Sequence, residues 1–304
     1  MALARGGCGD AVVTADIAGW TDAPRPAPVR GALRIENAVK HYGVGASRVL
    51  ALDGCSFDVR AGEICVVVGP SGCGKTTLLH AAAGFHGLDG GTIHLDGRLL
   101  CGDGSDATAP PGSDRVVVFQ NGALLPWKTN LENVMLGPRF QGRAPIAQVA
   151  AKARRLMRDD GLEGYENAYP GETSSGVKRR VEIVRALMND PAVLLLDEPF
   201  RALDSLTKSM MHAALLAIHA QNRSTIFFIT HDLEEAVFLG SRVVVMTSRP
   251  GRTKEVIDVD IPYPRTYDVL TSKRFREHVQ AATSIVHEEA LRAYERGERE
   301  GRAS

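Results

Sequence analysis

The sequence predicts an α/β fold with a parallel sheet core, a small antiparallel β subdomain and a helical insertion. Three observations lead to this prediction. Unbroken apolar runs recur along the chain, stretches of helical periodicity separate several of them, and alternating runs in the first third end at a hairpin turn. Unbroken apolar runs suit strands that are buried on both faces, as in a parallel sheet covered by helices.

Five unbroken apolar runs predict the strands of the parallel sheet, at residues 64–68, 116–119, 193–196, 225–229 and 243–246. Two other runs predict the antiparallel subdomain. Residues 55–59 alternate between apolar and polar, and residues 92–95 lead into Asp96 and Gly97, a strong hairpin-turn sequence.

Three apolar stripes with helical spacing predict helices. They are Val149, Ala153, Leu156 and Met157, then Val181, Val184, Leu187 and Met188, and finally Leu206, Met210, Ala213 and Ala217. Pro145 and Gly161 bound the first stripe, and Pro191 stops the second. These two stripes belong to the helical insertion, which we place at about residues 121–190.

The two ends of the sequence differ from the middle in composition. Residues 1–30 are rich in Ala, Gly, Pro and Arg without usable periodicity, so we expect a disordered tail. The folded domain is expected at residues 31–250, followed by a C-terminal appendage at residues 251–304 that carries a helix. From Glu288 onward this appendage is mostly charged, and we expect it to be solvated.

Composition excludes several classes of protein. Lys plus Arg (36) equals Asp plus Glu (36), whereas a general nucleic-acid-binding protein usually carries a basic excess. The five cysteines form no CxxC pair, which argues against a disulfide framework or a zinc site and fits a reducing cytosol. No apolar run approaches the roughly 18 residues that a membrane-spanning helix needs.

The strongest chemical signal is a glycine-rich loop between a predicted strand and a predicted helix. Its residues are Gly69, Pro70, Ser71, Gly72, Cys73, Gly74, Lys75, Thr76 and Thr77. Glycines let backbone N–H groups surround a phosphate, and the helix N-terminus adds positive potential. Lys75 is expected to reach the terminal phosphates of ATP, and Thr76 to offer its hydroxyl to Mg²⁺. A chance glycine-rich turn would lack the flanking strand and helix.

A second signal is the pair Asp197 and Glu198 at the end of an apolar strand. In open α/β sheets, ligands bind at the carboxyl ends of the strands. Alone, the pair would equally fit a solvated strand end. Together with the glycine loop, it predicts that Asp197 holds Mg²⁺ and that Glu198 polarises the attacking water.

The run from Tyr169 to Arg180 resembles the signature of ABC-type ATPases, in which Leu-Ser-Gly-Gly-Gln opens a helix. Ser174 and Gly176 match that pattern, whereas Thr173, Ser175 and Val177 depart from it. Three cations, Lys178, Arg179 and Arg180, crowd the first turn of this helix. They fit either an approaching phosphate or a solvated basic face.

The resemblance extends to four single residues and implies their roles. Gln120 would touch Mg²⁺ and the reacting water, and His231 would contact the γ-phosphate. Asp204 matches the loop after the carboxylate strand, where Arg201 replaces the more usual Gly. Tyr42 would stack on adenine. Taken singly, a histidine after a strand is usually structural, and a lone tyrosine usually packs in a core.

The resemblance implies a P-loop NTPase (RecA-like) core that hydrolyses ATP as a dimer. Two ATP molecules would lie between the glycine loop of one subunit and the signature of the other. Ser174 and Gly176 of the signature would bind nucleotide, as would Asp204 in the loop after the carboxylate strand. Residues 119–129 are most similar to the nitrate, taurine and sulfonate importer class. Such subunits energise separate transmembrane permease subunits, work with a solute-binding protein, and lie on the cytoplasmic face of the plasma membrane.

Three alternatives stay open. A non-transport ABC ATPase of DNA repair or translation would usually carry two such domains, a coiled coil or a zinc insertion. A GTPase would need a guanine motif of the NKxD type, which the chain lacks. The altered signature also fits a weakly hydrolysing half of a heterodimeric pair.

Leu124, Leu125 and Trp127 follow Gln120 closely and have two interpretations. They form either the small core of the helical insertion or part of a groove that receives a permease helix.

Overall fold

The computed structural model describes residues 29–102, 108–142 and 144–303 of this chain of 304 residues. Residues 1–28 of the expected tail lie outside the described residues. Arg30, the last residue of that expected tail, is bonded to the body, because its Nη2 donates to Asp190 O at 2.5 Å and its carbonyl accepts from the hydroxyl of Thr225 at 3.0 Å.

A six-stranded sheet forms the centre of the molecule, in the order β10-β9-β3-β8-β7-β6. Its strands are β3 (Ile64–Val68), β6 (Arg115–Val118), β7 (Val193–Asp197), β8 (Thr225–Ile229), β9 (Arg242–Met246) and β10 (Thr253–Asp258). The pairs from β9 to β6 are parallel, whereas β10 runs antiparallel to β9. The sheet thus continues beyond residue 250, where the sequence places the boundary of the folded domain.

A four-stranded antiparallel sheet lies beside the central one, in the order β2-β1-β4-β5. It consists of β1 (Leu33–Tyr42), β2 (Val49–Val59), β4 (Gly90–Leu95) and β5 (Arg98–Cys101), with a short 3-10 helix, η1 (Gly45–Ser47), between β1 and β2. Helix α1 (Lys75–Ala83) packs between the sheets, and Phe57 and Phe227 stack their rings across them at 6.1 Å.

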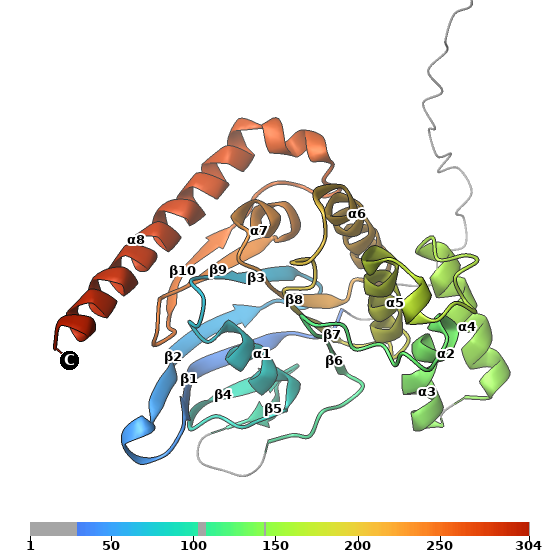
Figure 1. The fold of residues 1–304 in the computed structure, drawn as a ribbon, viewed down its shortest axis with the longest axis horizontal. Coiled ribbons are helices and arrows are strands. Elements are labelled where there is room, and N and C mark those ends of the chain that lie inside the picture. Colours follow the sequence, from blue (N-terminus) through green and yellow to red (C-terminus); the bar gives the residue numbers. More distant parts are fainter. Residues whose placement is uncertain (1–28, 103–107, 143, 304) are drawn as a thin grey trace, which may run out of the picture.

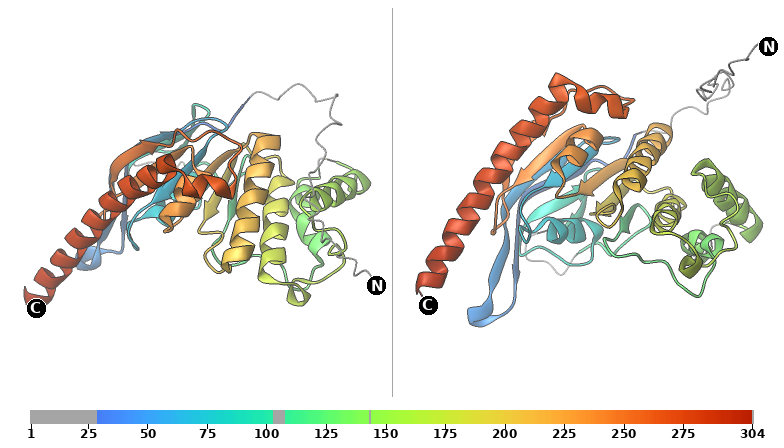
Figure 2. Two further views of the ribbon diagram at one scale, coloured as in Figure 1. Left: turned by 90° about the horizontal axis from the view of Figure 1, so that it is seen from above. Right: turned by 45° about the horizontal axis from the view of Figure 1, so that its top comes forward.

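The remaining helices cover the face of the central sheet opposite α1 and continue beside its β6 edge (Figure 1). Packed on that face are α5 (Ser175–Leu187), α6 (Ser205–Asn222), α7 (Leu233–Leu239) and α8 (Lys273–Ala303), with η3 (Tyr267–Thr271) before α8. Helix α5 also belongs to a helical group with α2 (Asn130–Val134), α3 (Leu136–Gln141), α4 (Ile146–Asp159) and η2 (Pro170–Glu172), which has its own apolar core. Figure 2 shows that α8 runs along the edge of the molecule and extends past the sheet.

The α/β fold predicted from the sequence is confirmed, but two details are corrected. On α6, Leu206 and Met210 are 72% and 50% exposed, whereas Met211 and Leu215 are buried. Apolar residues occur on both faces of this helix, so periodicity alone selects the wrong one. On α8, Glu289 is 2% exposed although it lies in the charged stretch expected to be solvated.

No helix within the three described ranges is long and apolar enough to cross a membrane.

Candidate active site

The glycine loop connects β3 to α1, as the sequence predicts, and its shape depends on glycine. Gly72 and Gly74 have φ angles of 75° and 95°, in the left-handed region that side chains disfavour. A side chain at Gly74 would also have no room, because its Cβ would lie 2.9 Å from the carbonyl oxygen of Ala51. The loop is therefore held in a tight turn by β2, on which it packs.

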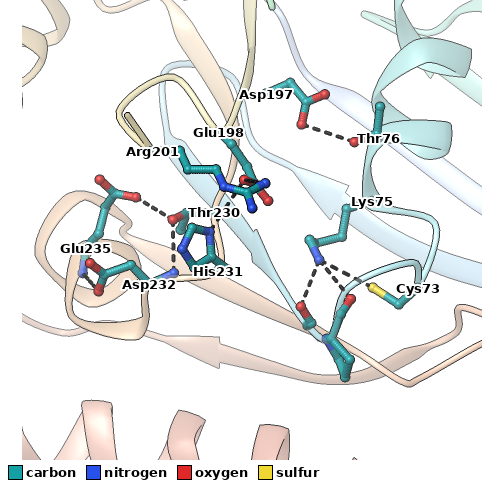
Figure 3. Close-up of polar contacts among 12 residues, drawn as sticks. Cys73, Lys75, Thr76, Asp197, Glu198, Arg201, Thr230, His231, Asp232 and Glu235 are labelled. Atoms are coloured by element: carbon teal, nitrogen blue, oxygen red, sulfur yellow. Dashed lines mark hydrogen bonds and ion pairs between the residues drawn. The ribbon is translucent and has the colours of Figure 1, made fainter. Parts of the chain in front are cut away.

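Lys75 lies inside this turn and is 7% exposed. Its Nζ donates to Gly69 O at 2.7 Å and to Pro70 O at 3.0 Å, and lies 3.7 Å from Cys73 Sγ (Figure 3). These partners are neutral, so the ammonium charge is not cancelled. The loop therefore concentrates positive charge at the N-terminus of α1, where the helix dipole also favours an anion.

Thr76 and Asp197 meet at the carboxyl end of β7. The Thr76 hydroxyl donates to Asp197 Oδ1 at 3.2 Å, and Asp197 is 4% exposed. Burial raises the pKa of the Asp197 carboxyl, although the hydrogen bond from Thr76 acts in the opposite direction. A hydroxyl and a buried carboxylate are oxygen ligands of the type that Mg²⁺ prefers. These two residues therefore fit the ion predicted for them.

Glu198 turns away from the strand immediately after Asp197. Its φ is 42°, its N–H donates to Ile229 O at 3.0 Å, and its side chain is 15% exposed. Glu198 Oε2 lies 3.5 Å from His231 Nδ1 and 3.2 Å from Arg201 Nη1 (Figure 3). The structure thus brings the predicted pair Glu198 and His231 together. It also shows that Arg201, which departs from the family pattern, pairs directly with Glu198.

A buried polar network holds the residues on either side of His231. Asp232 accepts from Glu235 N at 3.1 Å as the N-cap of α7, and its own N–H donates to the Thr230 hydroxyl at 3.0 Å. Thr230 in turn donates to the buried carboxylate of Glu235, which also bonds His212 Nε2 at 2.7 Å. His231 itself is exposed, so its ring is free to meet a ligand while its backbone is anchored.

Tyr42 ends β1 beside the glycine loop. Its hydroxyl lies 3.4 Å from the Thr77 hydroxyl and 3.1 Å from His86 Nε2, and 44% of the residue is exposed. A ring with that exposure is not part of the core, which removes the alternative of simple core packing. The position fits the adenine contact that the resemblance implies.

Gln120 follows β6, and side chains of α5 hold the backbone of the segment that contains it. Arg179 donates to Phe119 O and Gln120 O, both at 2.8 Å, and Ala123 N donates to Glu182 at 2.6 Å. Arg179 is 8% exposed and forms an ion pair with Glu182 at 2.6 Å. Both interpretations of Arg179, phosphate ligand or solvated cation, are therefore wrong, because a buried guanidinium needs these internal acceptors.

The signature residues lie at the N-terminus of α5. Ser174 caps the helix by accepting from Val177 N at 3.3 Å, and both Ser174 and Ser175 are exposed. Gly176 is buried, and a Cβ there would lie 2.7 Å from Thr207 Cγ2 on α6. Asp204 caps α6 by accepting from Thr207 N at 3.0 Å. The signature and Asp204 are therefore neighbours.

Apart from Gln120, whose backbone carbonyl accepts from Arg179 of α5, the predicted site residues fall into two groups. The loop group comprises Tyr42, residues 69–77, Asp197, Glu198 and His231. The signature group comprises Ser174, Gly176 and Asp204. Among the described residues, no hydrogen bond or ion pair joins the two groups within one chain.

An exposed aromatic pair beside Gln120 was not predicted. Phe85 and Phe119 stack at 5.8 Å and are 45% and 38% exposed. Trp127 is 70% exposed, so its interpretation as insertion core is wrong, whereas Leu124 packs partly against that core. The only sequence signal for Phe85 is an aromatic residue directly after Gly84, the glycine that ends α1.

Known proteins share this arrangement. Residues 52–201 match the family model described as ABC transporter. The chain is 42% identical over 261 residues to an ABC transporter ATP-binding protein of Methanocaldococcus jannaschii, covering 86% of this chain and 93% of that protein. It is 42% identical over 261 residues to the taurine import ATP-binding protein of Rhizobium johnstonii, covering 84% and 96%.

The fold is also similar to a solved dimeric ATP-binding cassette bound to ADP and phosphate. The TM-score is 0.65 at 28% sequence identity, over 76% of this chain and 100% of that one.

Proposed function

The chain belongs to the ABC transporter family of ATP-binding proteins, and from this premise we propose that it energises a membrane importer of a small solute such as taurine, another sulfonate or nitrate. The chain binds ATP and is an ATPase of this family. The geometry that carries the proposal is the meeting of Lys75, Thr76, Asp197 and Glu198 at one edge of the central sheet.

The residues of this edge divide the chemistry among them. Lys75 places its charge against the terminal phosphates, and the loop N–H groups orient them. Glu198 and His231 would hold the attacking water, with Glu198 accepting its proton. Mg²⁺, when bound, supplies positive charge that stabilises the transferring phosphoryl group, and Thr76, Asp197 and Gln120 would hold it.

The active unit that we propose is a dimer of this chain. One chain holds the loop group, whereas its own signature serines are exposed and no hydrogen bond or ion pair among the described residues joins them to that group. A second copy would bring its Ser174, Gly176 and Asp204 to the loop group of the first. The dimeric state of the similar solved cassette supports this arrangement.

The transmembrane partner is proposed to dock beside Gln120. Phe85 and Phe119 expose stacked aromatic rings there, Trp127 is exposed further along the same segment, and such residues anchor interfaces well. Because α5 begins with the signature and its Arg179 also holds the backbone of Gln120, a shift of the nucleotide site would reach this patch through α5. We therefore place the chain on the inner face of the plasma membrane, with permease subunits above it and a solute-binding protein beyond.

The variant Trp127→Ala tests the docking patch. Since the side chain is 70% exposed, we expect the melting temperature and the ATPase activity of the isolated subunit to stay near wild type. Co-purification with the permease and transport should fall together. Phe140→Ala is the matched control, because Phe140 is also an exposed aromatic of the helical group and is 86% exposed. Normal permease binding by Trp127→Ala would remove this residue from the interface.

The transported solute is tested in a reconstituted system. Vesicles containing this chain and the permease encoded beside it should hydrolyse ATP faster when taurine-loaded binding protein is added. If taurine, sulfonates and nitrate all leave the rate unchanged, the proposed solute class is wrong. A non-transport ATPase is the second candidate, and it would show full activity without any permease.

A further inference from the structure

The turn between β9 and β10 is in direct contact with the glycine loop. We call residues 247–252 the β9–β10 turn. Within it, Arg249 Nε donates to Gly72 O at 3.4 Å. A Cβ on Gly251 would lie 1.9 Å from Cys73 O, so the two backbones touch with no room for a side chain. A displacement of this turn must therefore displace the loop.

The sheet fixes one side of the β9–β10 turn. Gly251 N donates to Ala51 O, and Asp53 N donates to Gly251 O, both at 2.9 Å. These bonds tie the turn to β2, the strand on which Gly74 also packs. The turn and the loop thus share a common support.

Helix α8 holds the other side of the turn through one buried carboxylate. Glu289 Oε2 accepts from Ser248 N at 3.2 Å. Glu289 Oε1 lies 3.2 Å from Lys254 Nζ and accepts from Arg292 Nη1 at 3.0 Å. Burial would raise the pKa of Glu289, but the bonds from Lys254 and Ser248 outweigh it, so the pKa lies below its ordinary value. The carboxylate is therefore charged and fully engaged.

Burying a charge is costly unless it is paired and hydrogen-bonded, so the position of Glu289 depends on these three partners. The apolar face of α8 packs on the central core through Phe275 and, in part, Val279 and Val286, upstream of Glu289. Beyond Glu289 the helix exposes Leu291 and Tyr294, which are 51% and 67% accessible. Among the described side chains of α8, Glu289 is the last buried one, and its carboxylate is bonded to the turn that contacts the glycine loop.

A cavity of about 440 Å³ lies at this attachment, between the turn and the side chains of Glu289 and Arg292. Its lining residues come from the turn, from the start of β10 and from α8, so it lies where α8 meets the turn.

We propose that α8 sets the nucleotide affinity of the glycine loop, and that Glu289 is the positioning residue through which it acts on the β9–β10 turn. The inference rests on the proposed nucleotide site and goes beyond it, because it gives the C-terminal segment a role in that site. A change in the position of α8 is transmitted through Ser248 and Arg249 to Gly72. By thermodynamic linkage, nucleotide binding also stabilises the attached position of α8.

The test compares three variants of the full chain. Glu289→Ala removes the contact with the turn, and Glu289→Gln keeps the shape but loses the charge. Glu288→Ala is the matched control. The carboxylate of Glu288 is next to Glu289 in the sequence, is half exposed and pairs at 3.6 Å with Lys254, which lies outside the turn. The readouts are the equilibrium Kd for Mg-ATP, and KM and kcat for hydrolysis.

We expect Glu289→Ala to raise both the Kd for ATP and the KM about tenfold, as for the loss of a hydrogen bond to a charged group. For Glu289→Gln, we expect both values to rise about threefold. The value of kcat should change less than about twofold, since the loop shifts while Glu198 and His231 stay in place. Glu288→Ala should match wild type.

A folded Glu289→Ala that binds ATP as wild type does would overturn the proposal, as would an equal effect of Glu288→Ala. If Glu289→Ala fails to fold, an unchanged Kd in Glu289→Gln overturns it instead. Failure of the proposed importer function looks different, because ATP hydrolysis would then not respond to a permease, whereas the ATP affinities of these variants are measured without one.

Discussion

The two groups of the candidate site are held in opposite ways. In the loop group, Lys75, Thr76 and Asp197 are bonded to one another or to the loop backbone, and both Lys75 and Asp197 are buried. In the signature group, Ser174 and Ser175 are exposed at the N-terminus of α5. The chain completes one half of a nucleotide site by itself and displays the other half, which is the division that a two-subunit site needs.

Their supports differ as well. The glycine loop opens α1, which is packed between two sheets in a large apolar core. The signature opens α5 in the smaller helical group, where Asp160 Oδ2 is buried without a hydrogen-bond partner among the described residues. We therefore expect substitutions in the loop group to change chemistry, and those in the helical group to change stability or rate more gently.

The largest effect is expected in the loop group. Lys75→Ala should lower ATPase activity by about 100-fold or more and weaken ATP binding, because it removes the charge that meets the terminal phosphates. Glu198→Gln should stop hydrolysis to a similar extent yet retain ATP, because the loop stays intact. Steady-state kinetics and an ATP titration measure both effects. Equal loss of ATP binding in the two variants would contradict this division of roles.

The next effect concerns Asp160 in the helical group. Burial raises its pKa to about 6, with Arg180 acting in the opposite direction. The folded state then keeps a proton that the unfolded state loses, so stability falls as the pH rises from about 4 to 6, and the loss is complete above that range. After allowance for solvent screening, this loss is about 1–2 kcal/mol.

Asp160→Asn should abolish that dependence. Its free energy of unfolding relative to wild type should rise by about 1–2 kcal/mol between pH 4 and pH 7.5. Urea denaturation at both pH values measures the difference. A constant difference across this range would show that Asp160 ionises without penalty, and the helical group would then be as well satisfied as the loop group.

A smaller effect is expected at Ser175, which adds a side chain where the family signature has glycine. Because Ser174 and Gly176 remain, we expect slower turnover but intact function. Ser175→Gly should raise ATPase activity about twofold, since it lets the backbone approach phosphate more closely. If activity stays constant or falls, the signature group is already adapted to serine, and the contrast with the loop group is sharper than we propose.

The smallest effect is expected at the N-terminus, which belongs to neither group. Deleting residues 1–28 should leave ATPase activity and melting temperature nearly unchanged, because their composition offers no apolar pattern that could dock. Deleting residues 1–30 also removes the contacts of Arg30 with Asp190 and Thr225 and should lower the melting temperature slightly. A drop of several degrees on the shorter deletion would mean that the tail packs on the body.

The sequence by itself determined the fold class and the centre of the loop group. Buried strands such as β3 and β7 can be predicted because a strand covered on both faces must be apolar throughout. The turn around Lys75 can be predicted because it depends on glycines at fixed spacing, and a left-handed backbone is a local property. Asp197 and Glu198 follow from the same logic, since the end of a parallel strand lies at the ligand-binding edge.

Only the tertiary structure decided the features that depend on distant neighbours. The buried face of α6 could not be predicted, because apolar residues occur on both of its sides and the sheet selects one. Arg179 and Glu289 read as surface charges, yet both are buried because their partners come from other segments, the carbonyl of Gln120 and the side chain of Lys254. The pairing of Arg201 with Glu198, in contrast, is local and depends on the turn that reverses the chain between them. A hydrophobic pattern in the sequence predicts which apolar residues are buried. Which group pairs with a buried charge is determined only when the segments pack together.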